Sequence, residues 1–261
     1  MKLRTHTLIR LNVEQPTPMM LILRPRSGAG QWVHSASFDL RPFTPATEFP
    51  DNNGNLCQRL VAPAGAFEIE VETEVTVADE IDTAPGAFQT YAQDLPDYAL
   101  PLTLPSRYCE SDELGDVALD VASGHEPGYD QAEAIRQWIQ SNFEYKYGTS
   151  DATTSAAETI KQRQGVCRDF AHVGMALSRA LNLPARMVVG YLHELDPMDQ
   201  HAWYEVYLNN RWYTFDATQK EPKGGRVVVA YGRDAADVAL ISQWGPATME
   251  QMDVSVERLE G

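Results

Sequence analysis

The chain has 261 residues, which is enough for one large domain or two modest ones. Hydrophobic residues make up 43% of it and charged residues 22%, as in folded proteins, so intrinsic disorder is excluded. Its 37 acidic residues against 21 Lys and Arg give a formal net charge of -16, which would repel phosphates and anionic lipids; neither nucleic acid nor a membrane is an expected partner.

The first 80 residues alternate apolar and polar side chains in short runs. Residues 3–9 and 67–75 are examples, and Pro, Gly and Asn clusters separate such runs. One of these clusters, residues 51–55, lacks the carboxylate spacing of a calcium loop and is predicted to be a tight turn. The pattern predicts an all-β, sandwich-like N-terminal domain.

A segment rich in Pro and Tyr, residues 84–111, follows the β-rich region. Prolines interrupt regular structure, so the chain is expected to pass here from one module to the next. We place the boundary near residue 105, which gives a β-rich domain over residues 1–105 and a second domain over residues 106–261.

Helical patterns open the second domain. Apolar residues recur on one face between 130 and 143, and a shorter helix is expected over 112–122. The next helix should begin at 153–155, where Ser155 and Glu158 form a capping-box pattern, and end at Gly165. A further helix opens at or near Cys167 and ends before Pro184.

Strand-like segments come after these helices. They cover residues 186–192, 201–208 and 211–215, and the last two are joined by Asn209 and Asn210, a two-residue hairpin signal. Residues 226–230 and 252–256 add two more strands. Helices followed by an antiparallel sheet indicate an α+β domain.

Cys167 has the surroundings of a nucleophile. It lies at a predicted helix start, where unpaired amides and the helix dipole stabilise a thiolate, and Arg168 adds a positive charge beside it. The same amides could stabilise the oxyanion formed when the sulfur attacks a carbonyl group.

His201 and Asp216 are the candidate partners of this thiol. The predicted hairpin places His201 opposite a residue near 218, two positions from Asp216, so the carboxylate should reach the imidazole. A nucleophile, a base and an orienting acid on a helix start and two paired strands match the geometry of a catalytic triad.

Four segments in this order resemble the core of bacterial transglutaminase-like proteins. They are GVCRDFA at 165–171, PAR with GY at 184–191, HAWYEV at 201–206 and WYTFDAT at 212–218, and the resemblance extends over about residues 125–240. The first hundred residues are similar to the N-terminal domain often paired with that core. One departure is Ala217, where the family usually has Pro after the aspartate.

The resemblance implies a papain-like core in which Cys167, His201 and Asp216 form a Cys-His-Asp triad. It also implies acyl transfer through a thioester on a peptide, protein or small amide substrate. This chemistry requires no metal or organic cofactor, although calcium dependence, which some relatives show, stays open. Whether water or an amine accepts the acyl group stays open, as does the oligomeric state. The alternative is a catalytically inactive peptide-binding or scaffolding module with the same fold.

Other residues could share these roles. His193 is the main rival to His201 as the base, while His172 is expected to be a packed core histidine, and Cys57 and Cys109 to be structural. The second donor to the oxyanion is left open among four residues that precede the nucleophile: Trp138, Tyr145, Tyr147 and Gln164.

The number of cysteines and the length of the apolar runs indicate in which cellular compartment the protein is expected. Three cysteines are an odd, sparse set without the spacing of a zinc site or a disulfide framework, which favours a reducing compartment. The first 16 residues contain no apolar stretch of signal-peptide length, and no run reaches the roughly 18 residues of a membrane span. A cytoplasmic location is expected.

Overall fold

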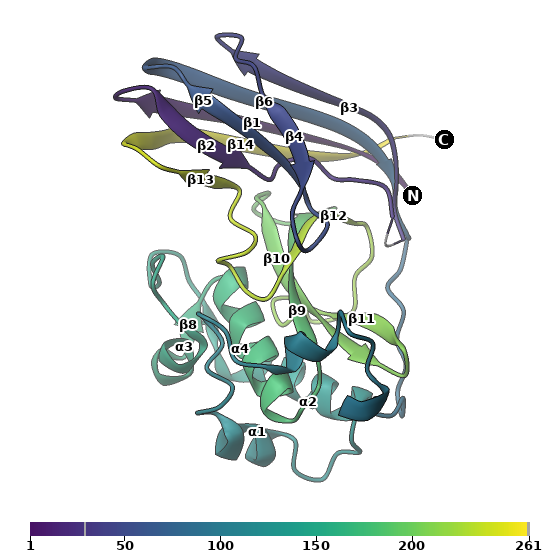
Figure 1. Ribbon diagram of the computed structural model, residues 1–261. Coiled ribbons are helices and arrows are strands. Elements are labelled where there is room, and N and C mark those ends of the chain that lie inside the picture. Colours follow the sequence, from purple (N-terminus) through teal and green to yellow (C-terminus); the bar gives the residue numbers. More distant parts are fainter. Residues whose placement is uncertain (29, 260–261) are drawn as a thin grey trace.

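The computed structural model describes residues 1–28 and 30–259, and it confirms an α+β chain. Figure 1 shows a β-sandwich at one end and a mixed helical and sheet module at the other. The Pro-rich segment, which connects the two along the chain, contains two short 3-10 turns, η1 (Ala92–Asp94) and η2 (Leu100–Thr103). Within the described ranges, no helix is both long enough and apolar enough to cross a membrane.

Two four-stranded sheets form the sandwich. Alternate residues of the long strands are buried between the sheets, among them Ile9, Leu11, Phe67 and Ile69, as the period-two pattern predicts. In spatial order, one sheet contains β14 (Ala247–Leu259), β1 (Lys2–Val13), β6 (Gly65–Thr76) and β3 (Trp32–Arg41); the other contains β13 (Ile241–Gln243), β2 (Thr17–Leu21), β5 (Leu56–Ala62) and β4 (Thr47–Pro50).

The C-terminal strands depart from the predicted division of the chain. We assigned residues 106–261 to one catalytic domain, but β13 pairs with β2, and β14 runs antiparallel along the whole of β1. Both strands therefore belong to the sandwich, where Lys2 at the start of β1 lies opposite Leu259 at the end of β14. A period-two pattern indicates that a segment is a strand but not which strand it pairs with, because pairing is a long-range choice. The boundary near residue 105 stays a prediction.

The second module is built on the sheet β11-β10-β9-β12. Its strands are β9 (Ala185–Leu192), β10 (His201–Leu208), β11 (Arg211–Phe215) and β12 (Arg226–Gly232). Leu208 pairs with Arg211 across Asn209 and Asn210, which both have positive φ, so the predicted hairpin and its register are confirmed.

Helix α4 (Cys167–Ala180) packs on this sheet, and α1 (Gly115–Val121), α2 (Tyr129–Asn142) and α3 (Ala156–Gln162) pack around α4 (Figure 1). The predicted capping box is present: Ser155 accepts from the Glu158 backbone and Glu158 accepts from the Ser155 backbone. Two short parallel strands, β7 (Glu144–Tyr145) and β8 (Gln164–Gly165), lead into α4.

Side chains of the sandwich cover the free edge of β12. The Gln31 amide donates to the carbonyl oxygen of Val228 and accepts from its N–H, both at 2.8 Å. Asn55 makes the same two-way contact with the backbone of Tyr231, also at 2.8 Å. Edge strands present unpaired backbone groups, and these amides satisfy them, so the sandwich is fixed to the sheet of the second module.

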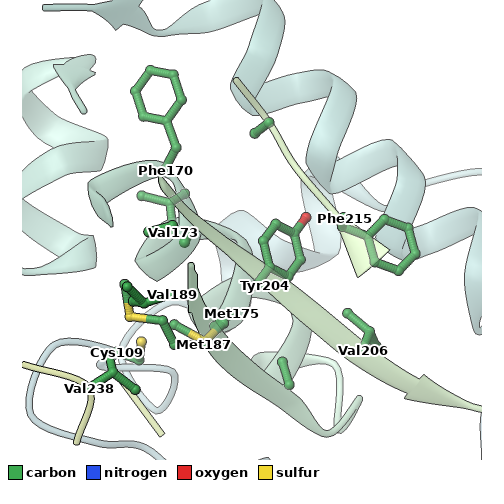
Figure 2. Packing of buried hydrophobic residues seen from close by; sticks show 14 of the residues in the cluster. Cys109, Phe170, Val173, Met175, Met187, Val189, Tyr204, Val206, Phe215 and Val238 are labelled. Carbon is green, nitrogen blue, oxygen red and sulfur yellow. The ribbon is translucent and has the colours of Figure 1, made fainter. Parts of the chain in front are cut away.

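The core of the second module lies between α4 and the sheet. Figure 2 shows Phe170 and Val173 from α4, Tyr204 from β10, and Met187 and Val189 from β9 as members of one buried cluster. Helix α4 carries Cys167 and strand β10 carries His201, so this packing sets the spacing between the two residues.

Gly174 of α4 lies directly against the Tyr204 ring of β10. A Cβ at this position would overlap the ring of Tyr204. We therefore expect Gly174→Ala to separate the helix from the strand and to lower the free energy of unfolding by about 1–3 kcal/mol. Urea denaturation measures this, with Gly115→Ala as the control, because a Cβ there meets nothing within 4 Å. Equal stability of the two variants would contradict this account of the packing.

Candidate active site

Cys167 is the first residue of α4, as predicted, and its side chain is partly exposed. The preceding turn is fixed by Asp169, which is fully buried and accepts from the Val166 N–H at 2.8 Å. Asp169 also accepts from Ser150 and from the guanidinium of Arg168. The carboxylate thus holds the first helical turn in place, and the sulfur stands at the positive end of the helix dipole.

His201 and Asp216 are hydrogen-bonded to each other. Nε2 of His201 lies 2.7 Å from Oδ2 of Asp216, and both residues are at least 95% buried. Cys167 and His201 line the same cavity, and the interaction with Cys167 contributes to the raised pKa of His201. The structure therefore brings together the three residues singled out from the sequence, with Nδ1 of His201 left free to exchange a proton with the thiol.

Asp216 has two further partners that sequence reasoning missed. Thr218 donates to Oδ1 from its backbone N–H at 3.0 Å and from its hydroxyl at 2.7 Å. Arg226, at the start of β12, donates to Oδ2 at 2.8 Å and is 8% exposed. Each carboxylate oxygen is thus held by groups other than His201, and this fixes the direction in which Asp216 faces the imidazole.

Arg226 also connects Asp216 to the aromatic wall of the site. Its guanidinium lies 4.9 Å from the ring centre of Trp203, and the Trp203 ring stacks on His201 with the centroids 5.9 Å apart. Trp203 is 1% exposed. His201 is therefore confined on one face by an indole ring and at Nε2 by a carboxylate, so it has little rotational freedom.

Electrostatics favour the charged forms of this pair. Burial lowers the pKa of His201, but the Asp216 carboxylate and the interaction with Cys167 outweigh it and raise the pKa to about 9. Burial likewise acts to raise the pKa of Asp216, while the charges of His201 and Arg226 hold that pKa well below its usual range. At neutral pH the site therefore contains an imidazolium and a carboxylate.

The raised pKa of His201 predicts a pH dependence of stability. The imidazolium stabilises the folded state fully below pH 6.5, and this contribution disappears as the pH rises to about 9. The free energy of unfolding should fall over that interval by about 3 kcal/mol more in the native protein than in His201→Asn. Urea titrations at a series of pH values measure the difference, and parallel curves for the two proteins would contradict the assignment.

Tyr145 is the one of the four candidate oxyanion donors that meets the nucleophile. Burial and the interaction with Cys167 raise the pKa of the Tyr145 hydroxyl, which places this hydroxyl beside the nucleophile. The pairing of β7 with β8 explains the placement, since Tyr145 lies opposite Gly165. Trp138 instead packs against Phe143 and the Arg163 guanidinium.

Two cavities flank His201. One, of about 430 Å³, is lined by Cys167 and His201 together with mainly apolar residues. The other, of about 120 Å³, is lined by His201 but not by Cys167, and its walls include Tyr145, Thr218 and Asp199. The imidazole therefore stands between a larger apolar space, which the sulfur shares, and a smaller polar one.

The other two histidines considered as partners of the thiol lie outside the cavity that Cys167 lines. His172 is fully buried, stacks on Tyr108 at 5.1 Å and accepts from the Ala235 N–H, and burial lowers its pKa to about 4. It is a core histidine, as predicted. His193 follows β9 and does not line the cavity beside Cys167, whereas His201 does.

The other two cysteines are buried in the core. Burial raises the pKa of the Cys109 thiol to about 12 and also raises that of Cys57. Both are therefore poor nucleophiles, in keeping with a structural role. Residues 1–28 and 30–259 contain no group of three or more His, Cys, Asp or Glu arranged to hold a metal ion.

Two family models match the chain. The transglutaminase-like superfamily matches residues 115–217, which contain all three site residues, and the bacterial transglutaminase-like N-terminal region matches residues 15–78. A crystal structure of a "Putative Cysteine Protease" from Cytophaga hutchinsonii superposes with a TM-score of 0.91 and is 37% identical, covering 100% of this chain and 91% of its own.

Curated proteins of bacteria are also similar to this chain. An uncharacterized protein of Mycobacterium leprae is 28% identical over 232 residues, which are 83% of this chain and 82% of the relative. One from Mycobacterium tuberculosis is 32% identical over 157 residues, and there the match covers 44% of the relative. With a transglutaminase-like core placed behind the matching N-terminal region, the chain belongs to the bacterial transglutaminase-like family.

Proposed function

We propose that the protein is a cysteine acyl-transfer enzyme acting on amide or peptide bonds through a thioester. The observation that carries the proposal is the hydrogen-bonded His201–Asp216 pair beside a thiol at a helix N-terminus, with Cys167 and His201 lining one cavity. This arrangement supplies a nucleophile, a proton carrier and an orienting carboxylate.

In the first half of the reaction the Cys167 thiolate attacks the carbonyl carbon of the substrate. The oxygen takes up the negative charge and can accept hydrogen bonds from the Cys167 backbone amide and the Tyr145 hydroxyl. The His201 imidazolium then gives its Nδ1 proton to the substrate nitrogen, the carbon–nitrogen bond breaks, and an amine leaves. The acyl group remains on the sulfur as a thioester.

In the second half, water or an amine attacks the thioester carbon, and neutral His201 takes the proton of the attacking group. The carbon–sulfur bond then breaks, which returns the thiolate and releases an acid or a new amide. Asp216 keeps Nε2 protonated throughout and stabilises the imidazolium. Thr218 and Arg226 hold Asp216 in the position that this role requires.

The molecule that accepts the acyl group, water or an amine, distinguishes hydrolysis from transfer. Likeness to the Cytophaga hutchinsonii protein favours hydrolysis, while the transglutaminase-like core equally accommodates transfer to an amine. Mass analysis of the products formed from a peptide library, with and without an added primary amine, distinguishes them. Free acids alone in both reactions indicate a peptidase or amidase, and amine-dependent new amides indicate a transferase.

The natural substrate is proposed to be a peptide, a protein or a small amide. We also keep a cytoplasmic site of action as part of the proposal, because the cysteine set is odd and sparse. A scaffolding role without catalysis is the remaining alternative. It predicts that an activated ester leaves no acyl group on Cys167, which intact-mass spectrometry detects directly.

A further inference from the structure

The cavity that Cys167 and His201 both line indicates which kind of acyl group the substrate has. During the proposed reaction the acyl group is bonded to sulfur, so it must occupy space that the sulfur lines. The cavity of about 430 Å³ meets this condition. The leaving and accepting groups need only reach the imidazole, and the smaller cavity lined by His201 without Cys167 suits them. The larger cavity is therefore the acyl side of the site.

Its walls are apolar. Strand β9 contributes Met187 and Val189, and the connection between β12 and β13 contributes Val238, Ala239 and Leu240. In Figure 2, Met187, Val189 and Val238 gather on one side of the core. Met187 and Val238 are at most 3% exposed, so they present fixed apolar surface rather than mobile side chains.

Two of the polar side chains that line this cavity, Arg168 and Tyr108, are bonded to other protein groups, whereas the side-chain nitrogen of Gln200 is buried without a hydrogen-bond partner among the described residues. Arg168 donates to Asp169 and to the carbonyl oxygen of Asp151, and the Tyr108 hydroxyl donates to the Ala152 carbonyl oxygen. No Asp, Glu or Lys lines it within the part of the chain that the structure describes. A positively charged substrate group entering the cavity would lose its hydration and meet the Arg168 guanidinium and the His201 imidazolium. A negatively charged group would also lose its hydration, and it would find Arg168 already paired with Asp169.

We propose that this cavity binds a bulky apolar acyl group of the substrate and rejects charged ones. The inference rests on the proposed function and names its substrate class: acyl donors with an extended aliphatic or aromatic group next to the reacting carbonyl. A volume of about 430 Å³ lies within the roughly 300–1,000 Å³ that ligand pockets occupy. Apolar walls of this kind gain binding energy with each methylene group buried.

The N-terminal sandwich takes part in forming the cavity. Leu240 packs against both the catalytic core and the sandwich core, and its carbonyl oxygen accepts from the Ile22 N–H at 2.9 Å. The wall around Ala239 and Leu240 is thus held by the first module. Selection of the acyl group therefore depends on both modules of the chain.

Three p-nitrophenyl esters with the same leaving group test the proposal: the acetate, the hexanoate and the anionic glutarate monoester. Stopped-flow release of nitrophenol gives the acylation rate constant of Cys167, and division by the rate with N-acetylcysteine removes intrinsic reactivity. The hexanoate is expected to react at least about 10-fold faster than the acetate, and the glutarate monoester more slowly than the acetate.

A matched pair of variants tests whether the preference for the hexanoate arises in this cavity. Ala239→Glu puts a carboxylate into the cavity and should lower the hexanoate-to-acetate ratio about 10-fold, toward unity. Ala236→Glu adds the same charge at an exposed position of the same segment, outside the lining, and should leave the ratio unchanged. Circular dichroism verifies that both variants are folded.

The outcomes separate this inference from the proposed function. If the acetate acylates Cys167 in a His201-dependent way but the hexanoate is no faster, the apolar acyl cavity is wrong and the enzyme assignment stands. An unchanged ratio in Ala239→Glu also overturns the cavity. If no ester acylates Cys167, the proposed function fails, and the inference fails with it.

Discussion

Replacing Cys167 with Ala is expected to remove turnover almost completely. The side chain supplies the attacking atom and carries the acyl group, so the thioester route is lost, and losses on the order of 10³–10⁶-fold accompany the removal of such nucleophiles. Turnover is measured with the p-nitrophenyl hexanoate described above. The fold should survive, because Cys167 is partly exposed at the helix start and its removal leaves only a small gap.

The control and the double variant make this prediction specific. Cys57→Ala removes a buried thiol outside the site, and its effect on turnover should be small. Cys167→Ala combined with His201→Ala should be no slower than Cys167→Ala alone, because residues that act as one unit show strongly non-additive losses. Additive losses, or turnover in Cys167→Ala near that of the native protein, would contradict the assigned nucleophile.

Arg226→Leu is expected to cost both stability and activity. The variant leaves the Asp216 carboxylate buried without one of its two cationic partners, and breaking a buried ion pair from one side costs about 3–5 kcal/mol. Because His201 and Thr218 still contact Asp216, we expect a loss near the lower end of that range. Urea denaturation measures the change in the free energy of unfolding.

Arg233→Leu is the matched control. Arg233 also pairs with an aspartate, Asp237, but its side chain is 58% exposed, so the loss should stay below about 1 kcal/mol. Adding Asp216→Asn to Arg226→Leu should recover part of the stability, because no unpaired carboxylate then remains buried. If the two arginine variants were equally stable, Arg226 would have no special role in holding Asp216.

The role of Arg226 in the reaction needs a kinetic readout as well. If Arg226 only positions Asp216, its loss should alter the basic limb of the pH–rate profile, because the orientation and pKa of His201 depend on that carboxylate. Arg226→Lys keeps a positive charge and should restore part of the native profile. A variant that lowers stability but leaves the profile unchanged would indicate a purely structural arginine.

Local signals in the sequence predicted the elements and register around the site. The Ser155 capping box, the helix start at Cys167 and the hairpin at Asn209–Asn210 each depend on neighbours a few residues apart, and the structure contains all three. The hairpin register in turn predicted that Asp216 reaches His201, as observed. These features follow from short-range backbone chemistry, which a sequence displays directly.

Features that depend on distant parts of the chain could not be predicted in this way. Arg226 reaches Asp216 because β12 lies beside β9, and an isolated arginine at a strand start carries no sign of that partner. Tyr145 meets Cys167 only through the pairing of two very short strands, β7 and β8. The pairing of β14 with β1 joins the two ends of the chain, and long-range strand pairing is the choice that local patterns determine least.

The central claim is that Cys167 and His201 act as one chemical pair. The most direct test is the rate of alkylation of Cys167 by iodoacetamide from pH 5 to pH 10, located by peptide mass mapping, in the native protein and in His201→Ala. The account predicts fast alkylation at pH 6–7 in the native protein and a slow reaction in the variant. The difference should narrow as the pH passes about 9, where His201 loses its proton. A thiol that reacts slowly at neutral pH and is indifferent to His201 would contradict the account and favour a binding module.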